Sequence, residues 1–405
     1  MLREVTVAVL VAGAAVVTGG VRGAEGVSQA TAGVGGMAWD LVRASGAGNA
    51  IVSPVSVWEA LAMTHAGARG ETAAQMAHVL GMPDDRAAIA AASEALRKLF
   101  TEAKGGKLAL DVANRIWVQK DTKLEAAFTA LLEARFGAGA GIVDFVGATE
   151  PARGEINAWV SDHTANKIDE LLKVGTITPL TRLVLTNAVS MKAPWATKFE
   201  KAGTRPEPFN LTADTQAAVP FMHQSGKFVA GKVGAGPKAA TVCEIPYEGG
   251  RLAMLVIVPD GVDGLAAVLA GLNGESLAGW KAGGLKPRQV NLALPKWTAR
   301  KPLGLNEALG AMGMKQAFQQ GVADFSGMDG TRDLFVSAVV HEGFVEVTEE
   351  GTEAAAATGV VITKRAMIRE PEETLDVRVD RPFAWAVIER GTSTILFAGV
   401  VADPR

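Results

Sequence analysis

The chain contains a single cysteine among its 405 residues, which excludes an intramolecular disulfide. Cys243 lies in the apolar stretch Thr241–Tyr247, and this setting favours a buried thiol over a reactive one. Basic and acidic residues nearly balance, which gives a net charge of −3. The sequence therefore lacks the excess of basic residues that is typical of nucleic-acid-binding proteins. The sequence also lacks a proline- or serine-rich linker and a fixed-period repeat. Because 48% of the residues are hydrophobic, we expect one large domain with a buried core.

The uncharged run Val5–Val17 near the start falls short of the roughly 20 residues that a membrane-spanning helix needs. It follows a basic residue, and Gly23–Ala24 is an acceptable cleavage site, which is the pattern of a secretory signal peptide. We therefore predict a signal peptide over residues 1–23 and a single domain over 24–405, with no membrane attachment after cleavage. Such a protein is secreted, or periplasmic in a bacterium. Because Glu4 weakens the basic start, an uncleaved anchor is the alternative.

Helical signals fill the first half of the mature chain. Ser53 before Pro54 predicts an N-cap and a helix that begins at Pro54 and ends near Gly67. Thr72 and Gln75 have the spacing of a capping box, which predicts the start of the next helix. Two more helices are predicted by apolar residues at helical spacing: Ile89, Ala92, Leu96 and Leu99 in one, and Leu124, Phe128, Leu131 and Phe136 in the other.

Strand signals follow in the second half. Residues 251–258 and 289–294 are short apolar runs closed by Pro259 and Pro295, and apolar residues occupy nearly every position of segments 383–388 and 394–401. The last two runs are typical of strands with both faces buried. Helices followed by strands, without strict alternation, indicate an α+β fold rather than a doubly wound sheet.

Residues from about 350 to 373 supply no face for a core, so we predict a long exposed loop, and loops of this length are usually functional. If its first half became a strand, alternate residues would share an uncharged face: Thr352, Ala354, Ala356, Thr358, Val360 and Ile362. That face fits a crowded sheet, in which a charge would be costly to bury. The alternative is a short helix capped by Thr352 and ended by Gly359, because alanine favours helices.

A series of short motifs runs in a fixed order along most of the mature chain. The motifs are Asn49-Ala-Ile-Val-Ser-Pro-Val-Ser56, Leu185-Thr-Asn-Ala-Val189 with Lys192 and Trp195, Glu244-Ile-Pro-Tyr247, Leu294-Pro-Lys296, Ala323-Asp-Phe-Ser-Gly327, His341-Glu-Gly-Phe-Val-Glu-Val-Thr-Glu-Glu-Gly-Thr-Glu-Ala-Ala355 and Asp380-Arg-Pro-Phe383. In this order they resemble the serpin family of serine protease inhibitors. The strongest match, His341–Ala355, is similar to the strand and hinge that precede the family's reactive-centre loop.

The resemblance implies a fold of three β-sheets and eight or nine helices, with an exposed reactive-centre loop at one pole. It also implies a mechanism in which a serine protease cleaves the loop, becomes acylated and is carried across the molecule as the loop inserts into the central sheet. The partner is then held in a covalent acyl complex. The inhibitor itself, implied to be a monomer, needs no cofactor, no metal and no catalytic residue.

The same resemblance assigns the reactive residues. The hinge of inhibitory members matches Glu349, Gly351, Thr352, Glu353, Ala354, Ala355, Ala356, Ala357 and Thr358. The family's spacing places the cleaved bond at Arg365–Ala366, and an arginine there fits the acidic pocket of a trypsin-like protease. Because the chain from Arg365 to Asp380 is longer than in familiar members, three alternative specificity residues stay open: Lys364, Met367 and Arg369.

The resemblance also implies a cluster that controls opening of the central sheet. Its members are Ser53, Ser56, Asn187 and His341, with Trp195 beneath the point where the loop would enter. A non-inhibitory serpin that acts as a carrier, chaperone or storage protein is the alternative function. The sequence lacks a Gly-x-Ser-x-Gly elbow, a His-Glu-x-x-His motif and a phosphate-binding loop, so we expect no enzymatic activity.

Overall fold

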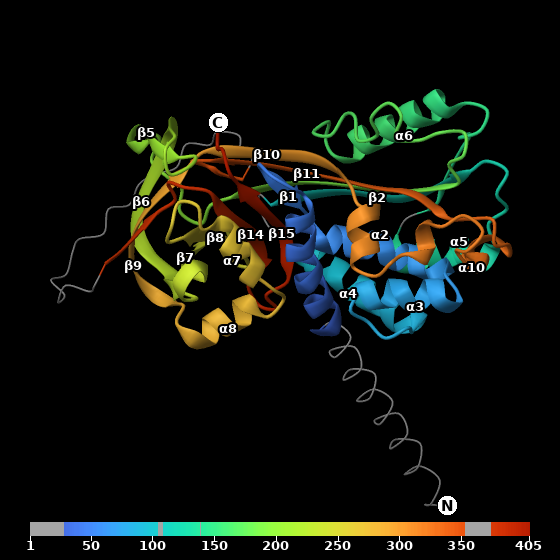
Figure 1. Cartoon of the computed structure of the whole chain (residues 1–405), viewed down its shortest axis with the longest axis horizontal. Coiled ribbons are helices and arrows are strands. Elements are labelled where there is room, and N and C mark those ends of the chain that lie inside the picture. Colours follow the sequence, from blue (N-terminus) through green and yellow to red (C-terminus); the bar gives the residue numbers. More distant parts are fainter. Residues whose placement is uncertain (1–27, 104–107, 138, 353–373) are drawn as a thin grey trace, which may run out of the picture.

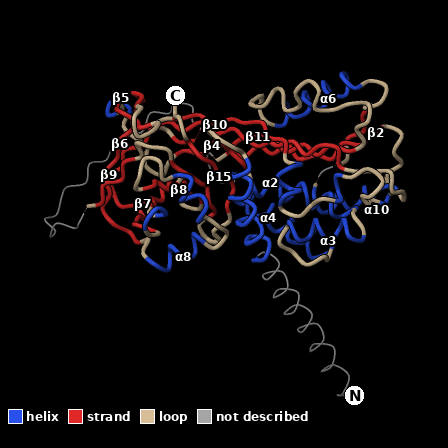
Figure 2. Tube along the Cα trace, viewed as in Figure 1, coloured by secondary structure: helices blue, strands red, loops and turns tan. Residues whose placement is uncertain are grey.

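The computed structural model describes residues 28–103, 108–137, 139–352 and 374–405. It confirms the α+β class. Figure 1 shows a long sheet with most helices of the first half on one side and helix α6 (Thr149–His163) on the other. A second body, made mainly of strands, lies at the opposite end of the molecule (Figure 2). The predicted signal peptide, residues 1–23, lies outside the described residues, and no helix among the described residues has the length and apolar character to cross a membrane.

The long sheet has six strands in the order β10-β11-β12-β4-β2-β3. Their bounds are Ala109–Gln119 (β2), Gly141–Val143 (β3), Leu183–Pro194 (β4), Trp297–Gly304 (β10), Val336–Thr348 (β11) and Gly351–Thr352 (β12). Strands β4 and β11 are parallel and pair directly from Leu183 to Ser190 on one side and from Val336 to Phe344 on the other. We call this line of pairing the seam. It ends where β12 lies between the two strands.

One side of the long sheet is covered by helices that the sequence largely predicts. They are the helix over residues 28–44, α2 (Pro54–Gly67), α3 (Gly70–Val79), α4 (Arg86–Ala103), α5 (Ala126–Leu131) and the π-helical segment η1 (Leu132–Phe136). Helix α2 begins and ends where Ser53, Pro54 and Gly67 predict. It is buried on nearly every side, which explains why it carries no polar stripe.

The capping box predicted at Thr72 and Gln75 is wrong, because Arg69 is the N-cap of α3. Both side chains bond to a distant segment instead. The Thr72 hydroxyl accepts the backbone N–H of Asp324 at 3.0 Å, and the Gln75 carbonyl accepts the backbone N–H of Gln316 at 2.9 Å. Tertiary contacts use the groups that a capping box would have used.

The second sheet runs β1-β15-β14-β8-β7-β6-β9-β13, with β5 paired to β6. Its strands are Ala50–Val52 (β1), Arg205–Asn210 (β5), Gln216–Val233 (β6), Ala240–Pro246 (β7), Leu252–Pro259 (β8), Lys286–Pro295 (β9), Leu375–Arg378 (β13), Phe383–Glu389 (β14) and Ile395–Val401 (β15). The four predicted strands are confirmed as β8, β9, β14 and β15, and the two that were predicted to be buried on both faces, β14 and β15, are buried at every position. Counted by continuous hydrogen bonding, the described strands form two sheets rather than three, because the long strand β6 pairs with both β7 and β9.

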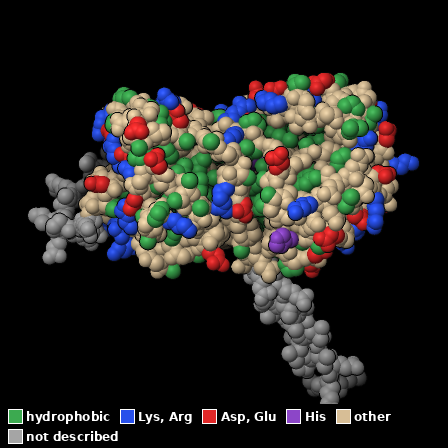
Figure 3. All heavy atoms as spheres, in the orientation of Figure 1, with side chains coloured by type: hydrophobic (Ala, Val, Ile, Leu, Met, Phe, Trp, Pro, Cys, Tyr) green, Lys and Arg blue, Asp and Glu red, His purple; other side chains and the backbone are tan. Residues whose placement is uncertain are grey.

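The remaining helices are short and lie around the second sheet and the ends of the long one. They are α7 (Leu265–Gly271), α8 (Ser276–Gly283), α9 (Asn306–Ala311), α10 (Ser326–Asp329) and the 3-10 segments η2 (Lys201–Gly203), η3 (Gly236–Lys238) and η4 (Gln316–Phe318). Cys243, on β7, is fully buried as expected, and burial raises the pKa of its thiol to about 12. Acidic and basic side chains are interspersed over the face drawn in Figure 3.

Helix α6 and the loop that follows it, residues 164–182, cover the outer face of the long sheet. Ile156 and Val160 of α6 belong to an apolar cluster that also contains Val184 and Ala188 of β4 and Val340 of β11. The same layer therefore lies against both strands of the seam.

Candidate functional site

The chain turns back on itself at one end of the seam. Strand β11 ends at Thr348, turns through Glu349 and Glu350, and returns as β12. Thr352 lies opposite Val347 of β11 and Ala193 of β4, and β12 is antiparallel to both strands. The first residues of the predicted loop thus already occupy the position of a new central strand.

Gly351 is required for this turn by its backbone geometry. Its φ is +149°, in a region that residues with a side chain rarely adopt. A Cβ atom there would lie 2.2 Å from the carbonyl oxygen of Ala193 and 2.5 Å from the Cα of Pro194. Only glycine lets β12 approach β4 this closely.

Thr352 is fully buried, and its hydroxyl lies 2.6 Å from the hydroxyl of Tyr247. The Tyr247 ring stacks on Trp195, with 4.6 Å between ring centroids and 9° between the ring planes. The indole Nε1 of Trp195 donates to the carbonyl of Thr348 at 2.9 Å. Because Thr352 belongs to a strand, it is not the cap of a helix; the rest of that alternative helix lies outside the described residues.

Two glutamates hold the turn through lysines. Glu349 pairs with Lys296 at 3.0 Å, and Glu350 pairs with Lys198 at 2.5 Å and with Lys201 at 3.1 Å. Burial raises the pKa of Glu349, but hydrogen bonds and Lys296 outweigh it and hold the pKa below its usual value. The lysines likewise lower the pKa of Glu350. Both carboxylates are therefore charged at neutral pH and fix the turn to the surrounding strands.

A second polar group lies farther down the seam and contains four of the predicted residues. His341 of β11 and Asn187 of β4 are directly opposite each other. The backbone N–H of Ser53 donates to Nε2 of His341 at 3.1 Å, so the proton of the imidazole is on Nδ1, which donates to Oδ1 of Asn187. Nδ2 of Asn187 donates to the hydroxyl of Ser56 at 2.6 Å. We call this group the seam network.

His341 is neutral in this setting. Burial lowers the pKa of its imidazole to about 3, and the ring is fully inaccessible to solvent. A neutral ring can accept one hydrogen bond and donate another, which is the arrangement observed between Ser53 and Asn187. The seam network therefore joins β4 and β11 through Asn187 and His341, and both ring nitrogens of His341 have a hydrogen-bond partner.

Sequence reasoning missed two members of this network. Asn114 of β2 accepts the Ser56 hydroxyl at 2.9 Å and also accepts from Nδ2 of Asn187. Its own Nδ2 donates to Glu59 of α2 at 3.3 Å. Glu59 lines a cavity of about 250 Å³ together with apolar residues such as Leu110 and Phe397. Neither residue lies in a motif with a known role, so only the fold reveals them.

Glu59 gives the protein a testable pH dependence. Burial raises the pKa of its carboxyl from 4.5 to about 7, although Arg97 and Asn114 lower it. The folded protein thus holds this proton more tightly than the unfolded chain, so the resulting stabilisation is complete below about pH 4.5 and is lost as the pH rises through about 7. We expect Glu59→Gln to abolish that loss. The free energy of unfolding of the variant minus that of the unmodified protein should then be higher at pH 8 than at pH 4 by roughly 1–2 kcal/mol. Unfolding curves of both proteins across this range check the prediction, and an equal difference at the two pH values contradicts it.

The structure does not bring all predicted site residues together. Trp195 directly follows the last residue of β4, near β12. Eight positions along the chain separate it from Asn187 of the seam network. The hinge residues from Glu353 to Thr358, the predicted bond Arg365–Ala366 and the alternatives Lys364, Met367 and Arg369 lie outside the described residues. Within the described residues, no cluster of histidine, cysteine or carboxylate side chains could hold a metal ion.

Comparisons with known proteins agree with this geometry. A family model described as Serpin (serine protease inhibitor) matches residues 37–404. Ipis-1 of Ixodes persulcatus is 38% identical over 88% of this chain and 93% of its own length. Leukocyte elastase inhibitor A of Mus musculus is 37% identical over 90% of this chain and 95% of its own length. The crystal structure of Serpin48 from the insect Tenebrio molitor aligns with a TM-score of 0.80 at 27% identity, covering 94% of this chain and 98% of that one.

Proposed function

Because this chain belongs to the serpin family, we propose that it is secreted and traps a trypsin-like serine protease as a suicide substrate. The family description and the name of the relative leukocyte elastase inhibitor A support protease inhibition. The N-terminal pattern supports secretion, and Arg365 supports the trypsin-like partner. The observation that carries the trapping mechanism is the position of β12 between β4 and β11.

Strand β12 has the direction and register that an inserting loop requires. It pairs antiparallel with both neighbours, and Thr352 faces the same side as the buried residues Val347 and Ala193. If the strand continued in this register, the pairing with β4 would run from Ala193 to Leu183 and end at residue 362. The inner side chains of such a strand are the uncharged set that begins with Thr352 and ends with Ile362.

Trapping follows from an ordinary proteolytic step. The protease serine attacks the carbonyl carbon of Arg365, the bond to Ala366 breaks, and the new amino group of Ala366 leaves with a proton. An ester then joins Arg365 to the protease. Insertion of the upstream chain as a central strand carries this ester to the far end of the sheet. The protease is distorted there, and the ester survives because water no longer reacts with it efficiently.

The specificity of the trap depends on the residue at the cleaved bond. Arginine at position 365 can form a bidentate pair with the buried carboxylate of a trypsin-like pocket. Several of the relatives carry the name leukocyte elastase inhibitor, and a protease with an apolar pocket would instead select Met367. Lys364 and Arg369 are the basic alternatives.

Incubation with trypsin, and in parallel with leukocyte elastase, tests this proposal. We expect an SDS-resistant complex with trypsin and a released C-terminal peptide that begins at Ala366. Arg365→Ala should slow complex formation about 100-fold, because it removes one partner of a buried charge pair. Lys364→Ala is the matched control and should have little effect.

Other outcomes assign the protein differently. A peptide that begins at Ile368, released by elastase within a stable complex, would move the specificity residue to Met367. Cleavage by every protease without any stable complex would favour the non-inhibitory alternative, a carrier, chaperone or storage protein.

A further inference from the structure

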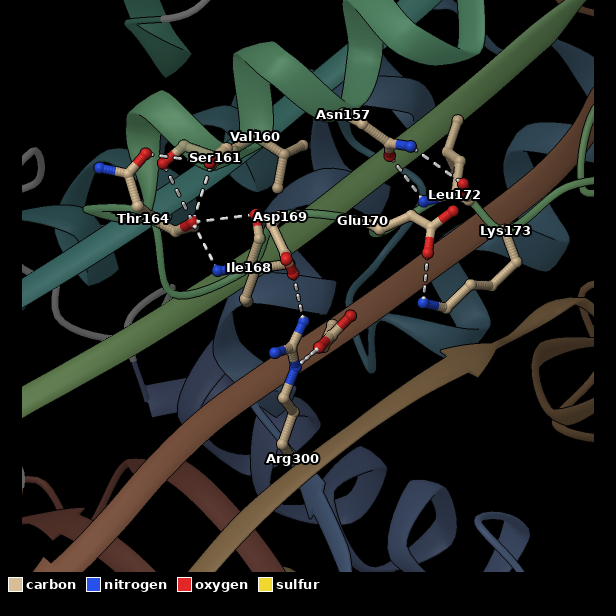
Figure 4. Close-up of polar contacts among 12 residues, drawn as sticks. Asn157, Val160, Ser161, Thr164, Ile168, Asp169, Glu170, Leu172, Lys173 and Arg300 are labelled. Carbon is tan, nitrogen blue, oxygen red and sulfur yellow. Dashed lines mark hydrogen bonds and ion pairs between the residues drawn. The ribbon is translucent and has the colours of Figure 1, made fainter. Parts of the chain in front are cut away.

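An ion-paired group crosses the outer face of the seam. Arg300 of β10 pairs with Asp169 of the loop after α6 at 2.8 Å and with Glu342 of β11 at 2.5 Å. Figure 4 shows the guanidinium of Arg300 directed toward Asp169. We call the Asp169–Arg300 pair the clasp, because it joins the loop that leads into β4 to the strand on the far side of β11.

The loop that carries Asp169 is fixed to the β4 side of the seam. It continues directly into Leu183, the first residue of β4. Helix α6, from which it comes, packs through Trp159 against Trp117 of β2, with 5.5 Å between ring centroids. Arg300, in contrast, belongs to β10, which pairs with β11 on the other side of the seam. The clasp therefore connects elements that lie on opposite sides.

Bonds within the layer make the loop and α6 a single unit. Asn157 of α6 donates to the carbonyl of Leu172 at 3.0 Å and accepts its backbone N–H at 2.8 Å. Glu170 pairs with Arg153 of α6 at 3.2 Å and with Lys173 at 2.8 Å, as Figure 4 shows for the latter. These contacts stay inside the layer and do not cross the seam.

A new strand between β4 and β11 separates the partners of the clasp. Neighbouring strands lie about 4.8 Å apart, so insertion moves β10 and β11 away from β4 by roughly that distance. A pair that is 2.8 Å long cannot span the added width while the loop remains with β4. From these distances we propose that the clasp must open before the loop passes down the seam, and that Asp169 and Arg300 thereby slow insertion. The inference rests on the proposed function, in which the loop inserts.

When β4 and β11 separate, Arg300 parts from Asp169 rather than from Glu342. The side chain of Glu342 is only 1% exposed, and an unpaired buried carboxylate would be costly, so Arg300 stays with β11. The side chain of Asp169 is 75% exposed and water can solvate it when the pair separates. Replacing Asp169 is therefore a clean test, because it removes no buried group.

The test measures insertion without a protease. A synthetic peptide with the sequence of residues 353–362, which begins after the residue already inserted, is mixed with the intact protein, and its incorporation is followed by the gain in heat resistance. We expect Asp169→Ala to accelerate incorporation about two- to fivefold, the range that an exposed ion pair supports. Glu170→Ala is the matched control on the same loop, and we expect its rate to equal that of the unmodified protein.

Stability of the two forms gives the second readout. Asp169→Ala should lower the melting temperature of the intact protein but not that of the peptide-filled protein, in which the clasp is already open. Equal incorporation rates for Asp169→Ala and Glu170→Ala would contradict the proposed role of the clasp. An equal decrease in the melting temperatures of the intact and the peptide-filled protein would contradict it as well. If the unmodified protein takes up no peptide at all, the proposed function itself fails, and the two failures are thus distinguished.

Discussion

Replacing Thr352 with arginine is expected to convert the inhibitor into a substrate. Thr352 is fully buried between Val347 and Ala193, and its hydroxyl contacts Tyr247. An arginine at this position would place an unpaired charge on the inner face of the sheet, which costs several kcal/mol. The first step of insertion would then be unfavourable, and the ester would hydrolyse before the protease is displaced.

The result is read from gels and melting curves. Thr352→Arg should give cleaved protein with almost no SDS-resistant complex, and cleavage should add little heat resistance. Glu346→Arg is the matched control, because residue 346 alternates with the buried residues Val345 and Val347 and faces the opposite side of β11. A yield of complex with Thr352→Arg equal to that of the control would refute the inserted position of residue 352.

Truncation of Asn187 is expected to produce the second large effect. Its side chain accepts from His341 and donates to Ser56 and Asn114, so Asn187→Ala leaves several buried polar groups without a partner. We expect a loss of about 2–4 kcal/mol in the free energy of unfolding of the intact protein. Denaturant unfolding measures this loss.

The cleaved form should respond much less to the same substitution. An inserted strand in the β12 register would place residue 358 between Asn187 and His341, so the pairing across the seam is already broken in that form. Ser190→Ala, a buried position on the opposite face of β4, is the control and should change the two forms similarly. An equal loss for Asn187→Ala in intact and cleaved protein would show that the seam network does not control opening.

Local signals in the sequence predicted those elements whose cause is local. Ser53 and Pro54 set the start of α2, and uninterrupted apolar runs gave β14 and β15, because burial on both faces leaves that pattern. The capping box failed because Thr72 and Gln75 bond to residues more than 200 positions away. No local pattern distinguishes a side chain that caps its own helix from one that holds another segment.

The site shows the same division. The resemblance named Ser53, Ser56, Asn187 and His341, and the structure brings them together. Tyr247 and Lys296 lie in motifs of the resemblance, although no role was assigned to them, and the other partners come from segments without such a motif: Asn114, Glu59, Lys198, Lys201, Asp169 and Arg300. Pairs such as Tyr247 with Thr352 join positions 105 residues apart, and only the folded chain defines them.

The docked turn at Glu349–Glu350 changes the kinetic nature of strand addition. Starting a new strand is normally the slow event, because chain entropy is lost before any pairing is gained. Here a hairpin is already nucleated, and Gly351 and Thr352 supply its first two paired positions. Growth from this point is propagation by adjacent residues and needs no search for a partner. The rate of the reaction is then set by the separation of β4 and β11 along the remainder of the seam.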